Sequence, residues 1–151
     1  MKSLIKLLTK KKLKISFAES CTGGLLASKF VSTPGISKVF NMGLIVYSNK
    51  AKSALLKISN IKIKKYGAVS KEVCNEMLLS LKKISKSNLC ITTTGIAGPS
   101  GGTRHKPVGT VYIGIKYNKK TLIKKSLYSG SRRAVQNKTI KDIFIIIDRL
   151  I

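Results

Sequence analysis

Ser20 and its neighbours have the residue types of a nucleophilic site. Ser20 lies in the stretch AESCTGG, from Ala18 to Gly24, between two apolar segments. A serine hydroxyl becomes a useful nucleophile only when a neighbouring base removes its proton. Cys21 is a rival nucleophile, although a buried thiol is as often a packing residue. Alternatively, Ser20 or Thr22 caps the helix that follows, because Ser and Thr are common N-cap residues.

The base that would activate Ser20 is either the single histidine or one of the 26 lysines. His105 lies in the segment GGTRHKPVG, and an isolated loop histidine is more often simply exposed. Lysine can act as the base when burial or neighbouring cations lower its pKa. Lys52 stands out because it follows Tyr47, which closes an apolar segment, within about one helical turn. Tyr47 could then hydrogen-bond Ser20 or relay its proton.

A long glycine-rich loop supplies the second group of candidate residues. The stretch TTTGIAGPSGGTRHKPVGT, residues 92–110, contains five glycines and two prolines. Loops of this length within a compact domain are usually functional. Its backbone N–H groups could hold a carbonyl, a phosphate or a ribose, and Thr94 could reach a ligand. Arg104 and Lys106 would add positive charge for a phosphate; a mobile surface loop is the alternative.

The formal net charge is +25, from 30 basic and five acidic residues. Such a charge suits a nucleic-acid-binding protein. The basic residues are spread along the chain, however, and only four are arginine, which reads bases and phosphates in a bidentate manner. A codon bias that favours lysine and isoleucine explains this composition without a nucleic-acid partner. We therefore expect only nonspecific attraction of nucleic acids.

The three cysteines are too few and too widely spaced for a disulfide framework or a zinc site. With one histidine and five acids, we expect no metal ion and no cofactor. No apolar run is long enough to span a bilayer. The N-terminus is interrupted by lysines and lacks the apolar centre of a signal peptide. These features predict a cytoplasmic protein without membrane contact.

The elements that must position these residues alternate between helix and strand. Helices are predicted over residues 3–12, 25–32, 50–57, 70 to beyond 84, and 132 to the end. Strands are predicted over residues 13–18, 39–47, 89–94, 111–117 and 122–127. A basic connection is predicted between the helix at 50–57 and residue 67. Strand 39–47 is apolar on both faces, as is typical of a central strand. We expect a single α/β domain over residues 1–151, with a mixed, mostly parallel sheet and helices on both faces.

Three separated stretches resemble the C-terminal domain of the CinA (competence/damage-inducible) family. They are AESCTGG (18–24), YSNKAK (47–52) and TGIAGPSGGTRHKPVGTV (94–111), and YGAVSKEV (66–73) is similar as well. They occur in the family's order, and the resemblance covers nearly the whole chain. Short stand-alone members, to which we assign the chain, are nicotinamide-nucleotide amidases. They convert nicotinamide mononucleotide to nicotinate mononucleotide and ammonia.

The resemblance implies a three-layer α/β/α domain and a metal-independent serine amidase. It also implies a homo-oligomer, with a dimer favoured, and a small nucleotide as substrate. Ser20 would be the nucleophile, Lys52 the base and Tyr47 a close neighbour, while N–H groups at the next helix start would stabilise the oxyanion. The expected substrate-binding residues are Thr22, Gly23, Gly24, Thr94, Gly95, Gly98, Gly101, Gly102 and Lys106.

Four positions depart from the family's pattern. Lys50 and His105 stand where the family usually has an acid, and the added cation at Lys50 would lower the pKa of Lys52. Ser131 and Gln136 stand where an aspartate and an arginine are expected. These departures motivate an alternative function, a CinA-like protein that binds a nucleotide without turnover. A basic nucleic-acid-binding module is the third hypothesis.

Overall fold

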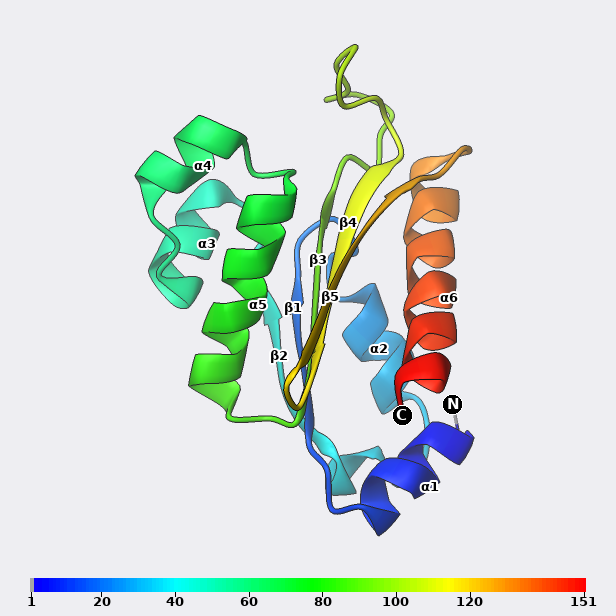
Figure 1. The fold of residues 1–151 in the computed structure, drawn as a ribbon. Helices are drawn as coiled ribbons and strands as arrows, with labels where there is room; N and C mark the ends of the chain where they lie inside the picture. The colour runs from blue at the N-terminus through cyan, green and yellow to red at the C-terminus, as the bar shows by residue number, and fades with distance from the viewer. Residues whose placement is uncertain (1) are drawn as a thin grey trace.

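Five strands form one sheet between two layers of helices, and the computed structural model describes residues 2–151 (Figure 1). The elements are α1 (Lys2–Lys10), β1 (Ile15–Glu19), α2 (Leu25–Val31), the 3-10 turn η1 (Ile36–Lys38), β2 (Phe40–Ile45), α3 (Asn49–Leu56), α4 (Asn60–Tyr66), α5 (Lys71–Ser85), β3 (Leu89–Gly95), β4 (Thr110–Tyr117), β5 (Lys120–Leu127) and α6 (Arg132–Leu150). The predicted α/β architecture is confirmed.

The sheet has the strand order β2-β1-β3-β4-β5. Strand β1 pairs in parallel with β2 and β3, while β4 and β5 are antiparallel to their neighbours. Glu19, the last residue of β1, lies level with Ile45 of β2 and Thr93 of β3. Three chain segments therefore leave the sheet at one edge, where ligand sites of open α/β sheets concentrate.

The predicted central position of strand 39–47 is wrong, because β2 is an edge strand. Along β2, half-buried residues alternate with exposed ones, and Asn41, Gly43 and Ile45 are exposed. A strand with one face towards solvent has this period of two. The polar Asn41 and the small Gly43 at alternate positions are the sequence signal for it.

Each face of the sheet has its own hydrophobic core. Helices α2 and α6 lie on one face, and helices α3, α4 and α5 lie on the other (Figure 1). Consecutive residues of β1 point to opposite cores: Phe17 packs in the first cluster and Ala18 in the second. In the first cluster the Phe17 and Phe30 rings meet edge to face, with centroids 5.1 Å apart. This two-sided burial fixes the register of β1 and the position of Ser20 after it.

The predicted basic connection before residue 67 contains a helix, α4, that the sequence analysis missed. Its N-cap is Ser59, whose hydroxyl accepts a hydrogen bond from the Ile61 N–H. Helix α5 begins where the sequence predicted, and the Ser70 hydroxyl caps it by accepting from the Val73 N–H. Val73, Met77 and Leu81 of α5 are buried, whereas Ile84 is 44% exposed. Within residues 2–151, no helix combines the length and apolar character needed to cross a membrane.

Candidate active site

Ser20 directly follows β1 at the carboxyl edge of the parallel strands. Its backbone N–H donates to the Thr93 carbonyl of β3 at 3.0 Å, which continues the pairing by one residue. Only 6% of Ser20 is exposed. The hydroxyl is therefore held by the sheet itself, and its surroundings are those of a protein interior.

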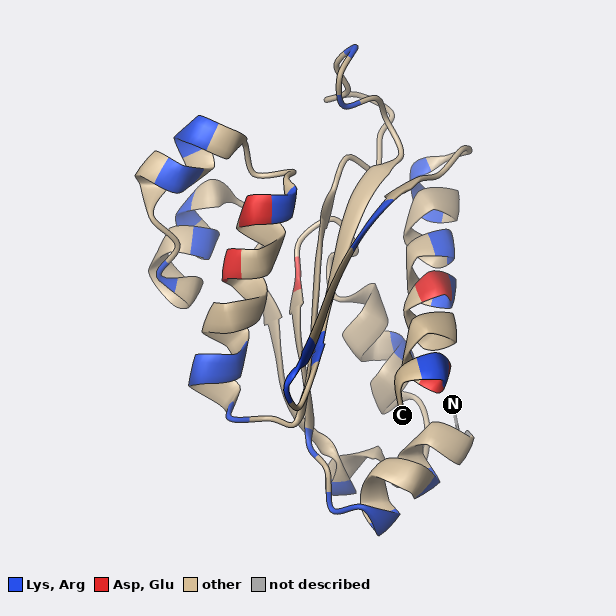
Figure 2. Cartoon of the chain, viewed as in Figure 1, with Lys and Arg blue, Asp and Glu red and all other residues tan. Residues whose placement is uncertain are grey.

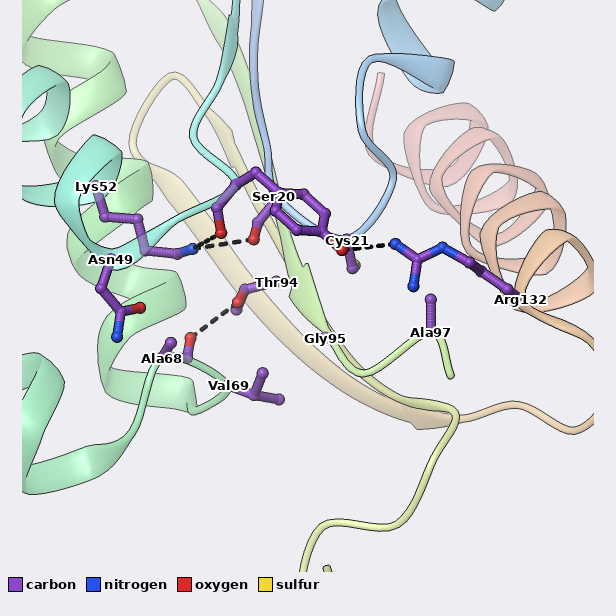
Figure 3. Close-up of a pocket in the computed structure, with 11 residues that line it drawn as sticks. Ser20, Cys21, Asn49, Lys52, Ala68, Val69, Thr94, Gly95, Ala97 and Arg132 are labelled. Carbon is purple, nitrogen blue, oxygen red and sulfur yellow. Dashed lines mark hydrogen bonds between the residues drawn. The ribbon is translucent and has the colours of Figure 1, made fainter. Parts of the chain in front are cut away.

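Lys52 is the residue that contacts the Ser20 hydroxyl. Helix α3 begins under the cap of Ser48, whose hydroxyl accepts from the Ala51 N–H at 3.0 Å. The first turn of α3 thus places Lys52 against the edge of the sheet, and the residue is 1% exposed. Its Nζ donates to Ser20 Oγ at 3.0 Å, and to the carbonyls of Val46 at 2.9 Å and Tyr47 at 3.1 Å (Figure 3).

Burial lowers the pKa of Lys52 below its ordinary value. The neighbouring Cys21 thiolate would raise the Lys52 pKa, but burial raises the pKa of Cys21 itself to about 12. The thiol is therefore neutral at ordinary pH and does not stabilise the ammonium. The predicted cause, a charge on Lys50, is wrong: Lys50 is exposed, and desolvation is the cause. A buried lysine whose acceptors are a hydroxyl and two carbonyls is suited to accept the proton of Ser20.

Glu19, rather than Ser20 or Thr22, caps the helix after the serine. Its carboxylate, in a residue 1% exposed, accepts hydrogen bonds from three backbone N–H groups at the start of α2. The donors are Gly24 at 3.1 Å, Leu26 at 3.1 Å and Ala27 at 2.8 Å. The Ser20 hydroxyl therefore takes no part in capping α2. The predicted oxyanion site at the start of this helix is wrong, because Glu19 already occupies those N–H groups.

A cavity of about 170 Å³ opens in front of Ser20 (Figure 3). It is lined by Ser20, Cys21, Tyr47, Asn49, Lys52, Ala68, Val69, Thr94, Gly95, Ala97 and Arg132. Ser20, Lys52, Tyr47, Thr94 and Gly95 were singled out from the sequence. The Thr94 hydroxyl donates to the Ala68 carbonyl at 2.8 Å, which holds the segment before α5 against the end of β3.

Tyr47 lies at the rim of the cavity and does not contact Ser20 through its hydroxyl. That hydroxyl accepts a hydrogen bond from Arg132 Nη2 at 2.6 Å, while the Tyr47 backbone carbonyl contacts Lys52. The predicted hydrogen bond or proton relay from Tyr47 to Ser20 is therefore not formed. Arg132 also donates from Nη1 to the Gly98 carbonyl at 2.8 Å. Arg132 was missed as a site residue, because no local signal shows that its side chain reaches the cavity.

Three predicted substrate-binding residues, Thr22, Gly23 and Gly24, lie outside the lining of this cavity. They border a neighbouring surface hollow, together with Arg133 and Gln136. The Thr22 and Thr93 hydroxyls share a hydrogen bond of 2.8 Å, which ties the turn after Ser20 to β3.

The long loop contributes less to the cavity than its glycines suggested. Gly98 is buried and offers its carbonyl to Arg132, whereas Gly101 and Gly102 are exposed. Lys106 does not face the cavity, because its Nζ donates to the Tyr66 carbonyl at the end of α4, 3.0 Å away. Arg104 and His105 are also exposed. Neither of these two residues is among those that line the cavity.

Two of the departures from the family's pattern form hydrogen bonds of their own. The Ser131 hydroxyl accepts from the Ala134 N–H at 3.3 Å and caps α6, a role for which serine and aspartate are comparably suited. Gln136 Nε2 donates to the Cys21 carbonyl at 3.0 Å, one residue after Ser20. Among residues 2–151, no three His, Cys, Asp or Glu side chains are grouped so as to hold a metal ion.

Comparisons with curated proteins identify close relatives. A competence-damage inducible protein of Thermoanaerobacter pseudethanolicus is 45% identical over 146 residues, which are 97% of this chain and 35% of the relative. A competence-damage inducible protein from Clostridium botulinum (strain Loch Maree) is 52% identical over 134 residues, which are 89% of this chain and 33% of the relative. The chain thus spans about a third of the length of these relatives.

Solved structures show the same fold. The competence/damage inducible protein CihA from Agrobacterium tumefaciens has a TM-score of 0.95 and 32% identity, over 99% of this chain and 92% of that one. A CinA superfamily protein from Enterobacter cloacae has a TM-score of 0.92 and 30% identity, over 99% and 89%. The family model of the CinA C-terminal domain matches residues 1–151. The chain therefore belongs to the CinA family through this C-terminal domain.

Proposed function

We propose that the chain is a nicotinamide-nucleotide amidase, which hydrolyses nicotinamide mononucleotide to nicotinate mononucleotide and ammonia. One observation carries the proposal: the amine of a buried lysine lies 3.0 Å from the hydroxyl of a buried serine, at the mouth of a cavity. A lysine whose pKa is lowered by burial and whose amine contacts a serine hydroxyl is the arrangement of a serine hydrolase that uses lysine as its base.

The reaction proceeds in two halves. Ser20 Oγ attacks the carboxamide carbon while its proton passes to Lys52 Nζ, and a tetrahedral oxyanion forms. Lys52 then gives this proton to the departing nitrogen, the C–N bond breaks, and ammonia leaves an ester on Ser20. A water molecule, deprotonated by Lys52, attacks the ester carbon and releases the carboxylic acid and the free serine.

The size and charge of the cavity support a nucleotide as substrate. At about 170 Å³ the cavity is smaller than the roughly 300–1,000 Å³ of pockets that enclose a whole drug-sized ligand. It suits the reacting amide end, with the remainder of the substrate at the rim. There the exposed Arg132 offers a guanidinium, the side chain best suited to hold a phosphate.

The rival hypotheses have less support. A binding protein without turnover was motivated by Ser131 and Gln136, yet both form hydrogen bonds in the structure. The nucleic-acid-binding hypothesis requires a basic surface in one place, whereas lysines and arginines lie on helices, sheet and loop alike (Figure 2). A cytoplasmic homodimer remains part of our proposal, and light scattering of the purified protein tests the dimer.

The test is the release of ammonia and nicotinate mononucleotide from nicotinamide mononucleotide by wild type and variants. We expect no turnover in Ser20→Ala, because the nucleophile is missing. We expect a loss of at least about a hundredfold in Lys52→Ala, the usual range for removal of a general base. The matched controls are Ser28→Ala on α2 and Lys50→Ala on α3, both exposed positions, which should retain the wild-type rate.

Two results would contradict the proposal. One is an unchanged rate in Ser20→Ala. The other is a nucleotide that raises the melting temperature of the wild type without being consumed, which would favour the binding protein.

A further inference from the structure

The turn after Ser20 contains two backbone N–H groups without an acceptor from another residue. Cys21 and Thr22 are 4% and 2% exposed. Within residues 2–151, neither N–H donates to a carbonyl or to a side chain of another residue. Buried backbone N–H groups are nearly always paired, so two adjacent ones beside a nucleophile require an explanation.

The carbonyls of the same two peptide units are held firmly. The Ser20 carbonyl accepts from the Gly23 N–H at 3.1 Å. The Cys21 carbonyl accepts from Gln136 Nε2 at 3.0 Å, across from α6. Both peptide bonds are trans, so each N–H points opposite to its carbonyl. Fixing the two carbonyls therefore fixes the direction of the Cys21 and Thr22 N–H groups.

The N–H groups of α2 are not available for the same task. Glu19 accepts from Gly24, Leu26 and Ala27, and the Leu25 N–H donates to the Thr22 carbonyl at 3.0 Å. A hydrolase that forms a tetrahedral oxyanion gains most from donors fixed before the reaction begins. The N–H groups of Cys21 and Thr22, one and two residues after Ser20 and without an acceptor from another residue, are the donors that remain for the substrate oxyanion.

We propose that the Cys21 and Thr22 N–H groups stabilise the oxyanion, and that Gln136 is a positioning residue that fixes the Thr22 N–H by holding the Cys21 carbonyl. Gln136 does not itself line the Ser20 cavity. It acts from α6 by anchoring a carbonyl, and an arginine at this position could donate to the same carbonyl. This inference rests on the proposed reaction class and adds a residue that stands at one of the departures from the family's pattern.

The experiment compares Gln136→Leu with Gln136→Arg. Leucine has a similar size and no donor, so the peptide is released and kcat falls about tenfold with little change in KM. The fall is smaller than the roughly hundredfold loss expected when an oxyanion donor is removed outright, because both N–H groups remain. Arginine restores a donor and recovers most of the rate. Asn137→Leu, an exposed amide on the same helix, is the matched control and keeps the wild-type rate.

A fluorophosphonate probe gives a second readout that does not need the amide substrate. Ser20 Oγ bonds to phosphorus as the P–F bond breaks, fluoride leaves with the electron pair, and the proton passes to Lys52. The rate of labelling at Ser20, followed by intact mass with Ser20→Ala as blank, should fall in Gln136→Leu and recover in Gln136→Arg. Circular dichroism confirms that the labelled variants are folded.

The outcomes separate this inference from the proposed function. Gln136-dependent labelling in a protein that does not consume nicotinamide mononucleotide would overturn the substrate but support the positioning role. Turnover and labelling that are unchanged in Gln136→Leu would overturn the positioning role alone. Equal impairment of the Leu and Arg variants would also overturn it, because the hydrogen bond would then not be the cause. Absence of any reaction at Ser20 in the wild type would overturn both.

Discussion

At the scale of single residues, the site depends on a lysine that pairs with no carboxylate among residues 2–151. The three acceptors of Lys52 Nζ are the Ser20 hydroxyl and two backbone carbonyls. A neutral amine has two N–H groups, which can donate to the two carbonyls, so that its lone pair can face the Ser20 hydroxyl and accept its proton. A carboxylate in their place would raise the pKa of the lysine and keep it protonated. Burial without a carboxylate partner is thus what suits Lys52 to act as a base.

This environment predicts the pH dependence of the reaction. Below the lowered pKa of Lys52 the amine is protonated and cannot accept the serine proton, so kcat/KM falls about tenfold per pH unit. Above that pKa the rate reaches a plateau. A lysine at its ordinary pKa of about 10.4 would give a rate that still rises at pH 9. We therefore expect an inflection below 10.4 in a profile measured at constant ionic strength.

Lys50→Ala is the control for this profile, because desolvation rather than the exposed Lys50 lowers the pKa of Lys52. Its inflection should stay within about 0.3 pH units of the wild type, since exposed charges interact weakly through water. A profile that rises without inflection to pH 10, or an inflection that moves upward in Lys50→Ala, would contradict the role given to burial.

At the scale of elements, the turn between β1 and α2 uses different residues to cap the helix and to supply the proposed nucleophile. Glu19 satisfies the N–H groups of α2, and Ser20 is left to react. Gly24, the residue directly before α2, has a φ of 94°, a left-handed conformation that side-chain-bearing residues rarely adopt. The acid in AESCTGG is therefore structural, although its position beside the serine suggests a catalytic role.

We predict that Glu19→Gln destabilises the fold. An amide can accept at its oxygen only, so at least one buried N–H at the start of α2 would face an NH₂ group. The expected loss is about 2 kcal/mol of unfolding free energy, the range for a hydrogen bond to a buried charged group. Urea denaturation of the two proteins measures it.

Glu72→Gln is the matched control for that change. Glu72 also lies in the first turn of a helix, α5, but it is exposed. Its replacement should cost no more than about 0.5 kcal/mol. Equal unfolding free energies for the two variants would show that the Glu19 carboxylate does not hold the turn.

The elements also show what sequence could and could not predict. Hydrophobic periodicity located α5 and α6, and Ser70 marked the start of α5, because these signals are local. The edge position of β2 is decided by which strands pair, so the apolar run over residues 39–47 was misplaced at the centre. Helix α4 is short and lysine-rich, and only the serine before it marks its start. The contact between Gln136 and Cys21 joins positions far apart in the chain and has no local signal.

The candidate site follows the same division. Ser20, Lys52 and the end of β3 could be located from the resemblance, since each lies in a contiguous motif. The roles of Arg132 and Lys106 could not, because each depends on where a side chain reaches in three dimensions. The Lys106 amine contacts the Tyr66 carbonyl at the end of α4, and Arg132 is the residue that lines the cavity.

At the scale of the whole molecule, the dominant feature is unbalanced positive charge. The formal net charge is +25, and the five acids cannot neutralise it. Two ion pairs link side chains in the described residues, Lys62 to Glu76 at 2.6 Å and Lys124 to Asp142 at 2.7 Å. Exposed pairs of this kind contribute at most about 1 kcal/mol each. Mutual repulsion of the lysines therefore outweighs the pairing and works against the compact state.

This balance predicts that sodium chloride stabilises the protein. Raising the ionic strength from about 0.01 to 0.15 M shortens the screening length from roughly 30 to 8 Å, which removes most repulsion between distant lysines. The same salt weakens the two ion pairs, but their small contribution cannot reverse the sign. We expect the melting temperature to rise by several degrees over this range, measured by circular dichroism at fixed protein concentration.

Sucrose of equal osmolarity, which does not screen charge, controls for solvent exclusion and should have a much smaller effect. A melting temperature that falls with salt would mean that attractive pairs, rather than repulsion among lysines, dominate the electrostatics of this fold.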